Sequence, residues 1–301
     1  MVPPIRRRIF VVGAPRSGTT LVQSLLASHS EVTSFTESHF FDRHFARLPL
    51  VATPILVRNP QIRAREFLLE NGVSSDRATA LLATSGLTAP GKGPPPMRTS
   101  QVARQLLQLL DELAHERQHL QWIEKTPRHL RYIPFLARLS RDVCPTHFVH
   151  VVRQGLDLVA SLHLASQHWE RHYDVDACVR RWNEDVGFSL GRVGSPVDHF
   201  VFYEDLTTDP ENVLRALLSK LDLGLQSEMI EHLEDTSADL ITDAEIWKKN
   251  LGNGVDRARS SRDKLTAVER DRAVAKLDQE LYERLRAASQ APCEGMSRLA
   301  G

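Results

Sequence analysis

Ile9-Phe10-Val11-Val12 is followed by Gly13-Ala14-Pro15-Arg16-Ser17-Gly18-Thr19-Thr20, and then by Leu21-Val22-Gln23-Ser24-Leu25-Leu26-Ala27. The first segment is apolar and mostly β-branched, which predicts a buried strand. The third segment has apolar residues at helical spacing, which predicts a helix. In a strand, glycine loop and helix in this order, backbone N–H groups and the positive end of the helix dipole point at one spot. The middle segment is therefore expected to bind an anion such as phosphate.

The glycine spacing of this loop, Gly13-x4-Gly18, is that of a Walker A loop. A Walker A loop continues with Lys, whereas this chain continues with Thr19. We therefore expect an anion in the loop, but not an ATP γ-phosphate held by a loop lysine.

Composition excludes several classes of protein. The chain has 301 residues, of which 42% are apolar, and its 38 Lys and Arg balance its 38 Asp and Glu. Because there is no net charge to attract nucleic acid or a membrane surface, neither is expected as a partner. The three cysteines form no CxxC pair, so neither a disulfide framework nor a cysteine zinc site is expected. The basic N-terminus precedes an apolar run too short for a signal peptide or anchor, which predicts a cytoplasmic protein.

Apolar runs that read as strands alternate with helical patterns from residue 9 to residue 221, which predicts one doubly wound α/β domain with a mainly parallel sheet. Further strands are expected at 32–35, 121–125, 146–152 and 199–203. Residues 45–100 are expected to form a helical cap, with a loop at 89–96. Two interpretations of the basic stretch 236–264 stay open: a segment that folds over a phosphorylated ligand, and an exposed loop. A helix from residue 266 closes a single domain over 1–301.

Charged residues follow four of the expected strands. Arg16 lies in the loop after the first strand, Glu37 follows the second, Lys125 ends the third and Arg153 follows the fourth. In an open α/β sheet, ligands bind outside the carboxyl ends of the strands. Each residue alone could be an ordinary surface or capping side chain. The four together predict a site for an anion and a general base.

His115-Glu116-Arg117-Gln118-His119 has the H-E-x-x-H pattern of zinc peptidases. It falls in a helix expected from residue 99 to about residue 120. Both histidines lie away from the apolar stripe of that helix, and no third ligand is evident. A zinc peptidase is kept as an alternative hypothesis.

The motifs, taken in order, resemble the sulfotransferases that use 3′-phosphoadenosine-5′-phosphosulfate (PAPS). Residues 15–20 resemble the family's loop for the 5′-phosphosulfate, and residues 202–206 resemble its Y-E-D-L strand end. Residues 37–43 are similar to the E-P-H-F-F-D segment of heparan sulfate sulfotransferases, and residues 124–127 to the E-K-[TS]-P of that branch and of tyrosylprotein sulfotransferases. The resemblance covers roughly residues 9–221. The 45–100 cap matches no segment of the family and is expected on the acceptor side, and 236–264 is expected to be a loop on the nucleotide side.

The resemblance implies a P-loop-like fold and a role for each matching residue. Glu37 is the expected catalytic base, and Lys125 and Arg16 act at the sulfuryl centre without a metal. The donor-binding residues implied by the resemblance are Arg16, Ser17, Gly18, Thr19, Thr20, Arg153, Ser161 and Tyr203. Arg153 and Ser161 correspond to the family's 3′-phosphate pair, and Tyr203 is expected near the adenosine.

The expected reaction moves a sulfuryl group from PAPS to a hydroxyl and releases adenosine 3′,5′-bisphosphate (PAP). The expected acceptor is a hydroxylated small molecule, a glycan or a peptide. Two alternatives stay open beside the zinc peptidase: a P-loop kinase that tolerates the missing lysine, and a non-catalytic phosphate-binding protein.

Overall fold

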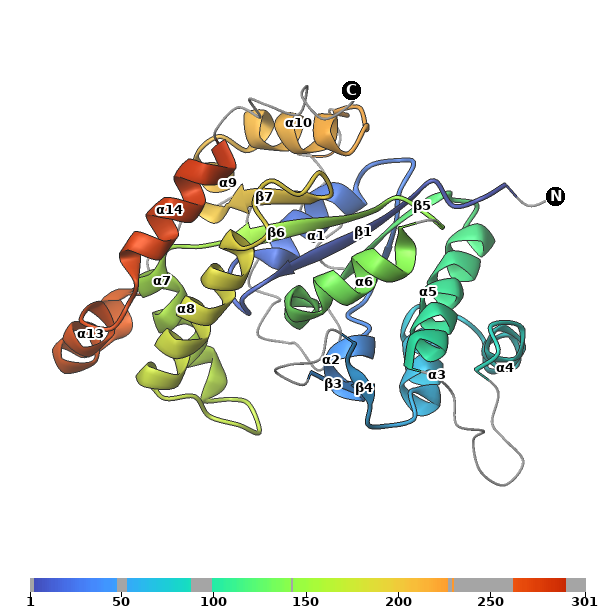
Figure 1. Ribbon diagram of the computed structural model, residues 1–301, viewed down its shortest axis with the longest axis horizontal. Helices are drawn as coiled ribbons and strands as arrows, with labels where there is room; N and C mark the ends of the chain where they lie inside the picture. Colours follow the sequence, from blue (N-terminus) through green and yellow to red (C-terminus); the bar gives the residue numbers. More distant parts are fainter. Residues whose placement is uncertain are drawn as a thin grey trace, which may run out of the picture.

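A five-stranded sheet in the order β2-β5-β1-β6-β7 forms the centre of the computed structural model, and every strand is parallel to its neighbours (Figure 1). The structure describes residues 3–47, 53–87, 99–141, 143–226, 229 and 262–290. The strands are β1 (Arg7–Gly13), β2 (Thr33–Phe35), β5 (Gln121–Lys125), β6 (Thr146–Val152) and β7 (Asp198–Phe202). β1 lies in the middle of the sheet, so the loop that follows it opens at the middle of the carboxyl edge.

Alternate residues of β1 enter two different cores, as expected for a sheet with helices on both faces. Ile9 and Val11 pack with α1 (Thr19–Ala27) and α10 (Pro210–Lys220). Phe10 and Val12 face the opposite way and share a core with α5 (Thr99–Glu116) and α6 (Ile133–Ser140). The doubly wound α/β prediction is therefore confirmed.

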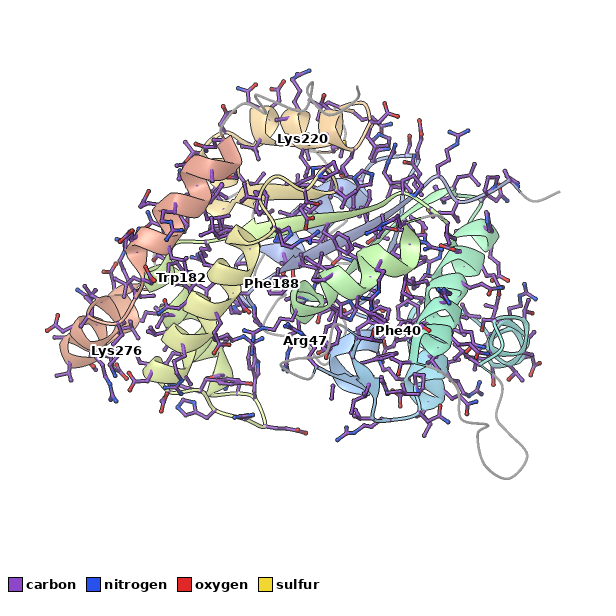
Figure 2. All side chains as sticks on the ribbon, in the orientation of Figure 1. Phe40, Arg47, Trp182, Phe188, Lys220 and Lys276 are labelled. Atoms are coloured by element: carbon purple, nitrogen blue, oxygen red, sulfur yellow. The ribbon has the colours of Figure 1, made fainter. Side chains whose placement is uncertain are left out.

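A third core, around Trp182, covers the sheet at its β6 and β7 strands. Trp182 lies on α8 (Val175–Leu190) beside α7 (Gly155–Ser166), and its position is labelled in Figure 2. Two C-terminal helices, α13 (Ala267–Val274) and α14 (Gln279–Gln290), pack on α8. The sequence predicted a single helix here. The chain instead breaks after Ala275 and starts again at Gln279.

Five short elements lie between β2 and α5, in the region expected to be a helical cap. They are α2 (Phe40–His44), β3 (Phe45–Ala46), β4 (Ile55–Leu56), α3 (Gln61–Glu70) and α4 (Ser75–Thr84). Two of them, β3 and β4, form an antiparallel pair that the sequence analysis did not predict. The loop expected at 89–96 lies outside the described residues. That residues 45–100 form a separate cap remains a prediction.

Several smaller predicted boundaries shift in the structure. The chain after β5 first forms a 3₁₀ turn, η1 (Pro127–Tyr132), before α6. β7 ends at Phe202, and Tyr203 opens the short helix α9 (Tyr203–Thr208) instead of ending the strand. Most of the stretch 236–264 lies outside the described residues, which begin again with η3 (Arg262–Lys264). No helix in the described part of the chain is long and apolar enough to cross a membrane.

The H-E-x-x-H stretch is not a continuous helix, so that part of the prediction is wrong. α5 ends at Glu116, and Gln118 takes a left-handed φ of 62°. The N–H of Gln118 donates to the carbonyl of His115 at 2.9 Å, and that of His119 donates to Ala114 at 3.0 Å. These two bonds form a Schellman motif, which terminates a helix. The two histidines therefore do not share one helical face as zinc-peptidase ligands do.

Candidate active site

The strand order divides the predicted site residues between the two sides of the β1 loop. β5 pairs with one side of β1, with Val11 opposite Lys125, and β2 lies beyond β5. β6 pairs with the other side, with Gly13 opposite Val151, and β7 lies beyond β6. Glu37 and Lys125 therefore lie on one side of the loop, and the residues that follow β6 and β7 lie on the other.

The loop itself needs glycine at both ends. A Cβ on Gly13 would lie 2.4 Å from the carbonyl oxygen of Val151, so the neighbouring strand leaves no space for a side chain. Gly18 has a φ of 101° and Arg16 a φ of 76°, both in the left-handed region that favours glycine. The turn is closed by the N–H of Ser17, which donates to Ala14 at 3.1 Å.

The geometry of the loop fits an anion. No side chain caps the N-terminus of α1 at Gly18, and the first turn of that helix carries no acidic residue. The hydroxyl oxygen of Ser17 is fully buried and has no hydrogen-bond partner within the described part of the chain. A buried polar group without a partner is costly unless a ligand satisfies it. Backbone N–H groups at the start of α1 and the Ser17 hydroxyl are therefore suited to phosphate oxygens.

On the β6 side, the predicted nucleotide residues contact one another. Arg16 Nε donates to Ser161 Oγ on α7 at 3.1 Å, and Arg153 Nη1 donates to the carbonyl of Arg16 at 3.3 Å. The guanidinium of Arg153 lies 4.4 Å from the centre of the Tyr203 ring. Tyr203 also packs on the loop, since a Cβ on Gly18 would lie 2.4 Å from its ring. Residues from four elements thus form one cationic group beside the loop.

Glu204, the residue after Tyr203, links the elements on the β6 side of the site. Glu204 accepts a hydrogen bond from the N–H of Gln154 at 2.8 Å, immediately before α7. Its other oxygen accepts from the hydroxyl of Tyr282 on α14 at 3.2 Å. Glu204 therefore joins the ends of β6 and β7 to the C-terminal helices. The described end of the 236–264 stretch lies nearby, with Arg262 3.6 Å from Asp157 of α7.

On the β5 side, Lys125 and Glu37 form an ion pair in which Lys125 Nζ donates to Glu37 Oε1. The lysine side chain is only 3% exposed, whereas that of Glu37 is 17% exposed. Charges buried to this degree depend on each other, because each alone would be costly to desolvate. The carboxylate is the more accessible member, so an incoming ligand can reach it.

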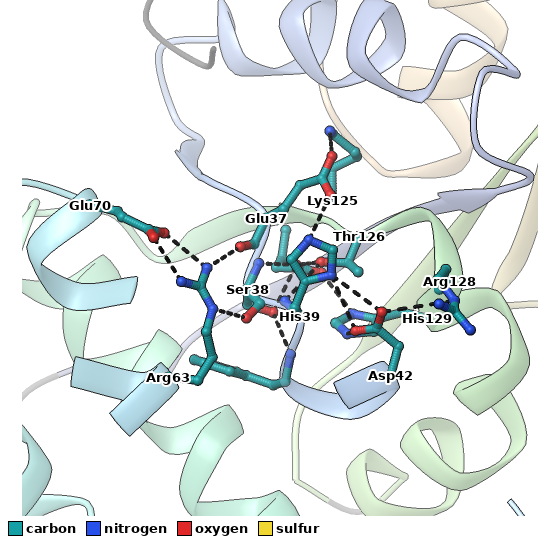
Figure 3. A network of polar contacts seen from close by, with 12 residues as sticks. Glu37, Ser38, His39, Asp42, Arg63, Glu70, Lys125, Thr126, Arg128 and His129 are labelled. Atoms are coloured by element: carbon teal, nitrogen blue, oxygen red, sulfur yellow. Dashed lines mark hydrogen bonds and ion pairs between the residues drawn. The ribbon is translucent and has the colours of Figure 1, made fainter. Parts of the chain in front are cut away.

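His39 is a second partner of Glu37, and the sequence analysis assigned no role to it. Its Nε2 lies 3.1 Å from Glu37 Oε2, and its Nδ1 lies 3.3 Å from Asp42 (Figure 3). Burial alone would lower the pKa of His39, but the hydrogen bonds to Asp42 and Glu37 outweigh it and raise the pKa to about 9. Burial alone would raise the pKa of Asp42, but the hydrogen bond from His39 outweighs it and holds the pKa at about 2. The signal in the sequence that could have identified His39 is its position close to Glu37 and Asp42.

Arg63 of α3 is another residue that the sequence analysis missed. Its Nη2 donates to the carbonyl of Glu37 at 2.7 Å, and its Nε donates to the carbonyl of Ser38 at 2.9 Å. Two further bonds, at 2.7 and 2.9 Å, join it to Glu70 of the same helix (Figure 3). α3 therefore supports the loop that carries Glu37. No local sequence signal links Arg63 to this loop.

The remaining predicted residues lie at the start of α1. Thr19 is buried and Thr20 is partly buried in the first turn of that helix. The structure thus brings the predicted residues into two groups, one on each side of the β1 loop. Of the nucleotide-side loop predicted at 236–264, residues 236–261 lie outside the described residues.

Three curated relatives match about three quarters of the chain at low identity. An uncharacterized protein of Aquifex aeolicus is 25% identical and matches 76% of this chain. A protein-tyrosine sulfotransferase of Drosophila melanogaster and protein-tyrosine sulfotransferase 2 of Gallus gallus are each 23% identical and match 75% of it. The matched regions span 27%, 40% and 54% of these relatives' own lengths.

Solved sulfotransferases share the fold. The sulfotransferase domain of the Synechococcus PCC 7002 olefin synthase superposes with a TM-score of 0.62 at 16% identity, covering 97% of this chain and 98% of that one. The sulfotransferase domain from the curacin biosynthetic pathway gives 0.55 at 19% identity, covering 91% and 98%. A mouse sulfotransferase in complex with PAP gives 0.50 at 10% identity, covering 93% and 85%.

A family model described as "Sulfotransferase family" matches residues 8–227. The match runs from β1 past α10, and it includes both groups of site residues. The chain therefore belongs to the sulfotransferase family.

Proposed function

We propose that the chain transfers the sulfuryl group of PAPS to an acceptor hydroxyl. The observation that carries this proposal is the division of the site by the β1 loop. A buried Lys125–Glu37 pair lies on one side, and the group around Arg153 lies on the other. A donor whose 5′-phosphosulfate lies in the loop then has its nucleotide on the β6 side and its sulfur facing Glu37.

The donor contacts follow from the chemistry of each group. The N–H groups at the start of α1, with the hydroxyls of Ser17, Thr19 and Thr20, hold the 5′-phosphate. Arg153 and Ser161 bind the 3′-phosphate, and this contact selects PAPS over ATP. The ring of Tyr203, stacked on the Arg153 guanidinium, lies beside the adenosine.

In the transfer step, a bond forms between the acceptor oxygen and sulfur while the bond from sulfur to the bridging phosphate oxygen breaks. The leaving oxygen keeps the electron pair, and PAP is released. Glu37 accepts the proton of the attacking hydroxyl, a role worth typically ~10²–10⁴-fold in rate. Lys125 and Arg16 stabilise the charge that builds on the bridging and sulfuryl oxygens. A sulfuryl group carries less charge than a phosphoryl group, so we expect the step to need no divalent metal.

The acceptor belongs to one of three chemical classes: a hydroxylated small molecule, a glycan or a peptide. Two relatives are named protein-tyrosine sulfotransferases, which supports testing tyrosine peptides. The structural neighbours from biosynthetic assemblies support testing small hydroxylated molecules. The cytoplasmic location expected from the sequence stays a prediction.

A binding experiment separates this proposal from the kinase alternative. We expect PAP to bind tightly by calorimetry and EDTA to leave its affinity unchanged. Tight binding of Mg·ATP with no binding of PAP would contradict the proposal. Tight PAP binding without transfer from PAPS to any tyrosine peptide, glycan or phenol would instead favour a non-catalytic phosphate-binding protein.

The base is tested with the variant Glu37→Gln, which keeps the shape of the side chain but cannot accept the proton. Transfer from PAPS should fall at least 100-fold while the Kd for PAP changes less than threefold. Glu211→Gln on α10 is the matched control, because its side chain is 59% exposed and pairs with Arg215 of the same helix. If Glu37→Gln transfers sulfate at the rate of that control, Glu37 is not the base.

A further inference from the structure

Glu124 is a fully buried carboxylate that is bonded to the residue after Glu37. It precedes Lys125 at the end of β5, and its side chain is 0% exposed. The loop that carries Glu37 passes over it, because β2 pairs with β5 and Phe35 lies opposite Glu124. A buried carboxylate is retained in a core only when its oxygens are well satisfied. The partners of Glu124 therefore indicate what it does.

Both oxygens of Glu124 accept hydrogen bonds. Oε1 accepts from the N–H of Ser38 at 3.0 Å, from the Ser38 hydroxyl at 2.9 Å and from the hydroxyl of Thr126. Oε2 accepts from Nδ1 of His129 at 3.0 Å. Figure 3 shows Ser38, Thr126 and His129 gathered beneath His39. Each of these side chains is itself buried.

The same three side chains also accept N–H groups from the loop. The N–H of His39 donates to Thr126 Oγ1 at 3.3 Å, and that of Phe40 donates to Ser38 Oγ at 3.4 Å. The N–H of Phe41 donates to His129 Nε2 at 3.2 Å. Including Ser38 itself, four successive backbone N–H groups are bonded to Glu124 directly or through one side chain.

The direction of these bonds requires a carboxylate at position 124. His129 accepts at Nε2, so a neutral ring carries its proton on Nδ1 and donates it to Glu124. The Ser38 hydroxyl has one proton, and it points to the same carboxylate. An amide in place of Glu124 would present N–H groups to at least one of these donors.

We propose that Glu124 is a positioning residue whose ionised carboxylate fixes the backbone of residues 38–41 and so holds Glu37 between Lys125 and His39. The carboxylate lies too deep to reach a substrate, and it acts through the backbone of the loop. This inference rests on the proposed function only for its effect on turnover. Its effect on the loop can be measured without any acceptor.

The variant Glu124→Gln removes the charge and keeps the volume. Asp198→Asn is the matched control, because Asp198 is also 0% exposed and accepts a bond from a buried histidine, His150, at 2.8 Å. Asp198 is the first residue of β7, so it lies at the opposite end of the sheet from Glu37. Both variants place an amide where a buried carboxylate was. They differ in their distance from the loop, and Asp198 also pairs with Arg192.

Turnover should separate the two variants. Glu124→Gln should lower kcat for sulfuryl transfer at least 100-fold and change the Kd for PAP less than threefold. Asp198→Asn should keep kcat within threefold of the wild type. Glu124→Asp retains the charge, and we expect it to recover at least a tenth of the wild-type kcat.

The loop is tested by amide hydrogen exchange. The amides of residues 38–41 should exchange at least tenfold faster in Glu124→Gln than in Asp198→Asn. Nitrogen-15 spectra of labelled histidine should show His129 protonated on Nδ1 in the wild type.

If Glu124→Gln does not fold, two other variants test the same network. Ser38→Ala and Thr126→Val each remove one hydrogen-bond donor to Glu124 and should lower kcat about tenfold.

The outcomes distinguish the two proposals. Unchanged exchange at 38–41 in Glu124→Gln would overturn the positioning role, and so would faster exchange with an unchanged kcat. If the wild type transfers sulfate to no acceptor but its loop amides respond as expected, the structural role of Glu124 holds and the proposed function fails.

Discussion

Nε2 of His39 lies 3.1 Å from Oε2 of Glu37. The other oxygen of the same carboxylate accepts the bond from Lys125, so Glu37 lies between two nitrogen donors. His39 has a left-handed φ of 53°, a strained conformation for a residue with a side chain. The strain and the raised pKa both indicate that the loop is built to hold a protonated imidazole beside the proposed base.

We expect this histidine to make stability pH-dependent. Its pKa is about 6.5 when exposed and about 9 in the folded protein, so the folded state binds the proton more tightly. The stabilisation is complete below about pH 6.5 and is lost as the pH rises through about 9. Unfolding by urea should show His39→Gln to be less stable than the wild type by about 3 kcal/mol at pH 6, a difference that disappears by about pH 10. The exposed His168 offers the control His168→Gln. A constant difference between pH 6 and 10 would contradict the charge assignment.

Arg63→Met tests whether α3 supports the loop. The change leaves the carbonyls of Glu37 and Ser38 without their donor, which should cost roughly 2 kcal/mol in the free energy of unfolding and about tenfold in kcat. Arg65→Met is the control on the same helix, since the bonds from Arg65 to Ser75 are exposed to solvent and their loss should cost under about 0.5 kcal/mol. Urea unfolding and sulfuryl transfer measure both effects. Equal effects of the two variants would show that the loop does not depend on α3.

Gly18→Ala tests the packing of Tyr203 on the phosphate loop. Both Gly18 and Gly72 have positive φ, 101° and 81°, so alanine strains the backbone at either position. Only at Gly18 would the new methyl group collide, 2.4 Å from the Tyr203 ring, whereas nothing lies within 4 Å at Gly72. Gly72→Ala should cost about 1 kcal/mol of stability and leave PAP binding unchanged. Gly18→Ala should also weaken PAP binding at least tenfold by calorimetry. Matching PAP affinities in the two variants would rule out the contact as part of the site.

Arg153→Gln tests the predicted 3′-phosphate contact. Wild-type protein should prefer PAP over adenosine 5′-monophosphate, because only PAP has the phosphate that Arg153 binds. The variant should lose at least tenfold in PAP affinity, as expected for a charge-assisted bond to phosphate, and little in affinity for the monophosphate. Arg215→Gln on the exposed face of α10 should keep the wild-type preference. A preserved preference in Arg153→Gln would place the 3′-phosphate elsewhere.

The prediction of H-E-x-x-H as a helical motif shows where local reasoning fails. The periodicity of residues 99–116 is correct, and α5 covers that range. The termination at Gln118 was not signalled, because a left-handed residue at a helix end is usually glycine or asparagine. The left-handed conformation of Gln118 therefore ends the helix on which the zinc-peptidase hypothesis depended.

The sequence by itself determined the strand, loop and helix of residues 7–27, because their contacts are local and follow from hydrophobic periodicity and glycine placement. It also predicted Glu37, Lys125 and Arg153 at strand ends. Only the tertiary structure decided which strands are neighbours, and hence that Glu37 meets Lys125 on one side of the loop while Arg153 meets Tyr203 on the other.

The tertiary structure also decided which residues support the loop that carries Glu37. Ser38 and Glu124 are 86 positions apart, and Ser38 and Arg63 are 25 apart. Which buried carboxylate or guanidinium satisfies a loop depends on how β5 and α3 pack against it. Packing of this kind is a property of the whole core, whereas periodicity and glycine placement act over a few residues.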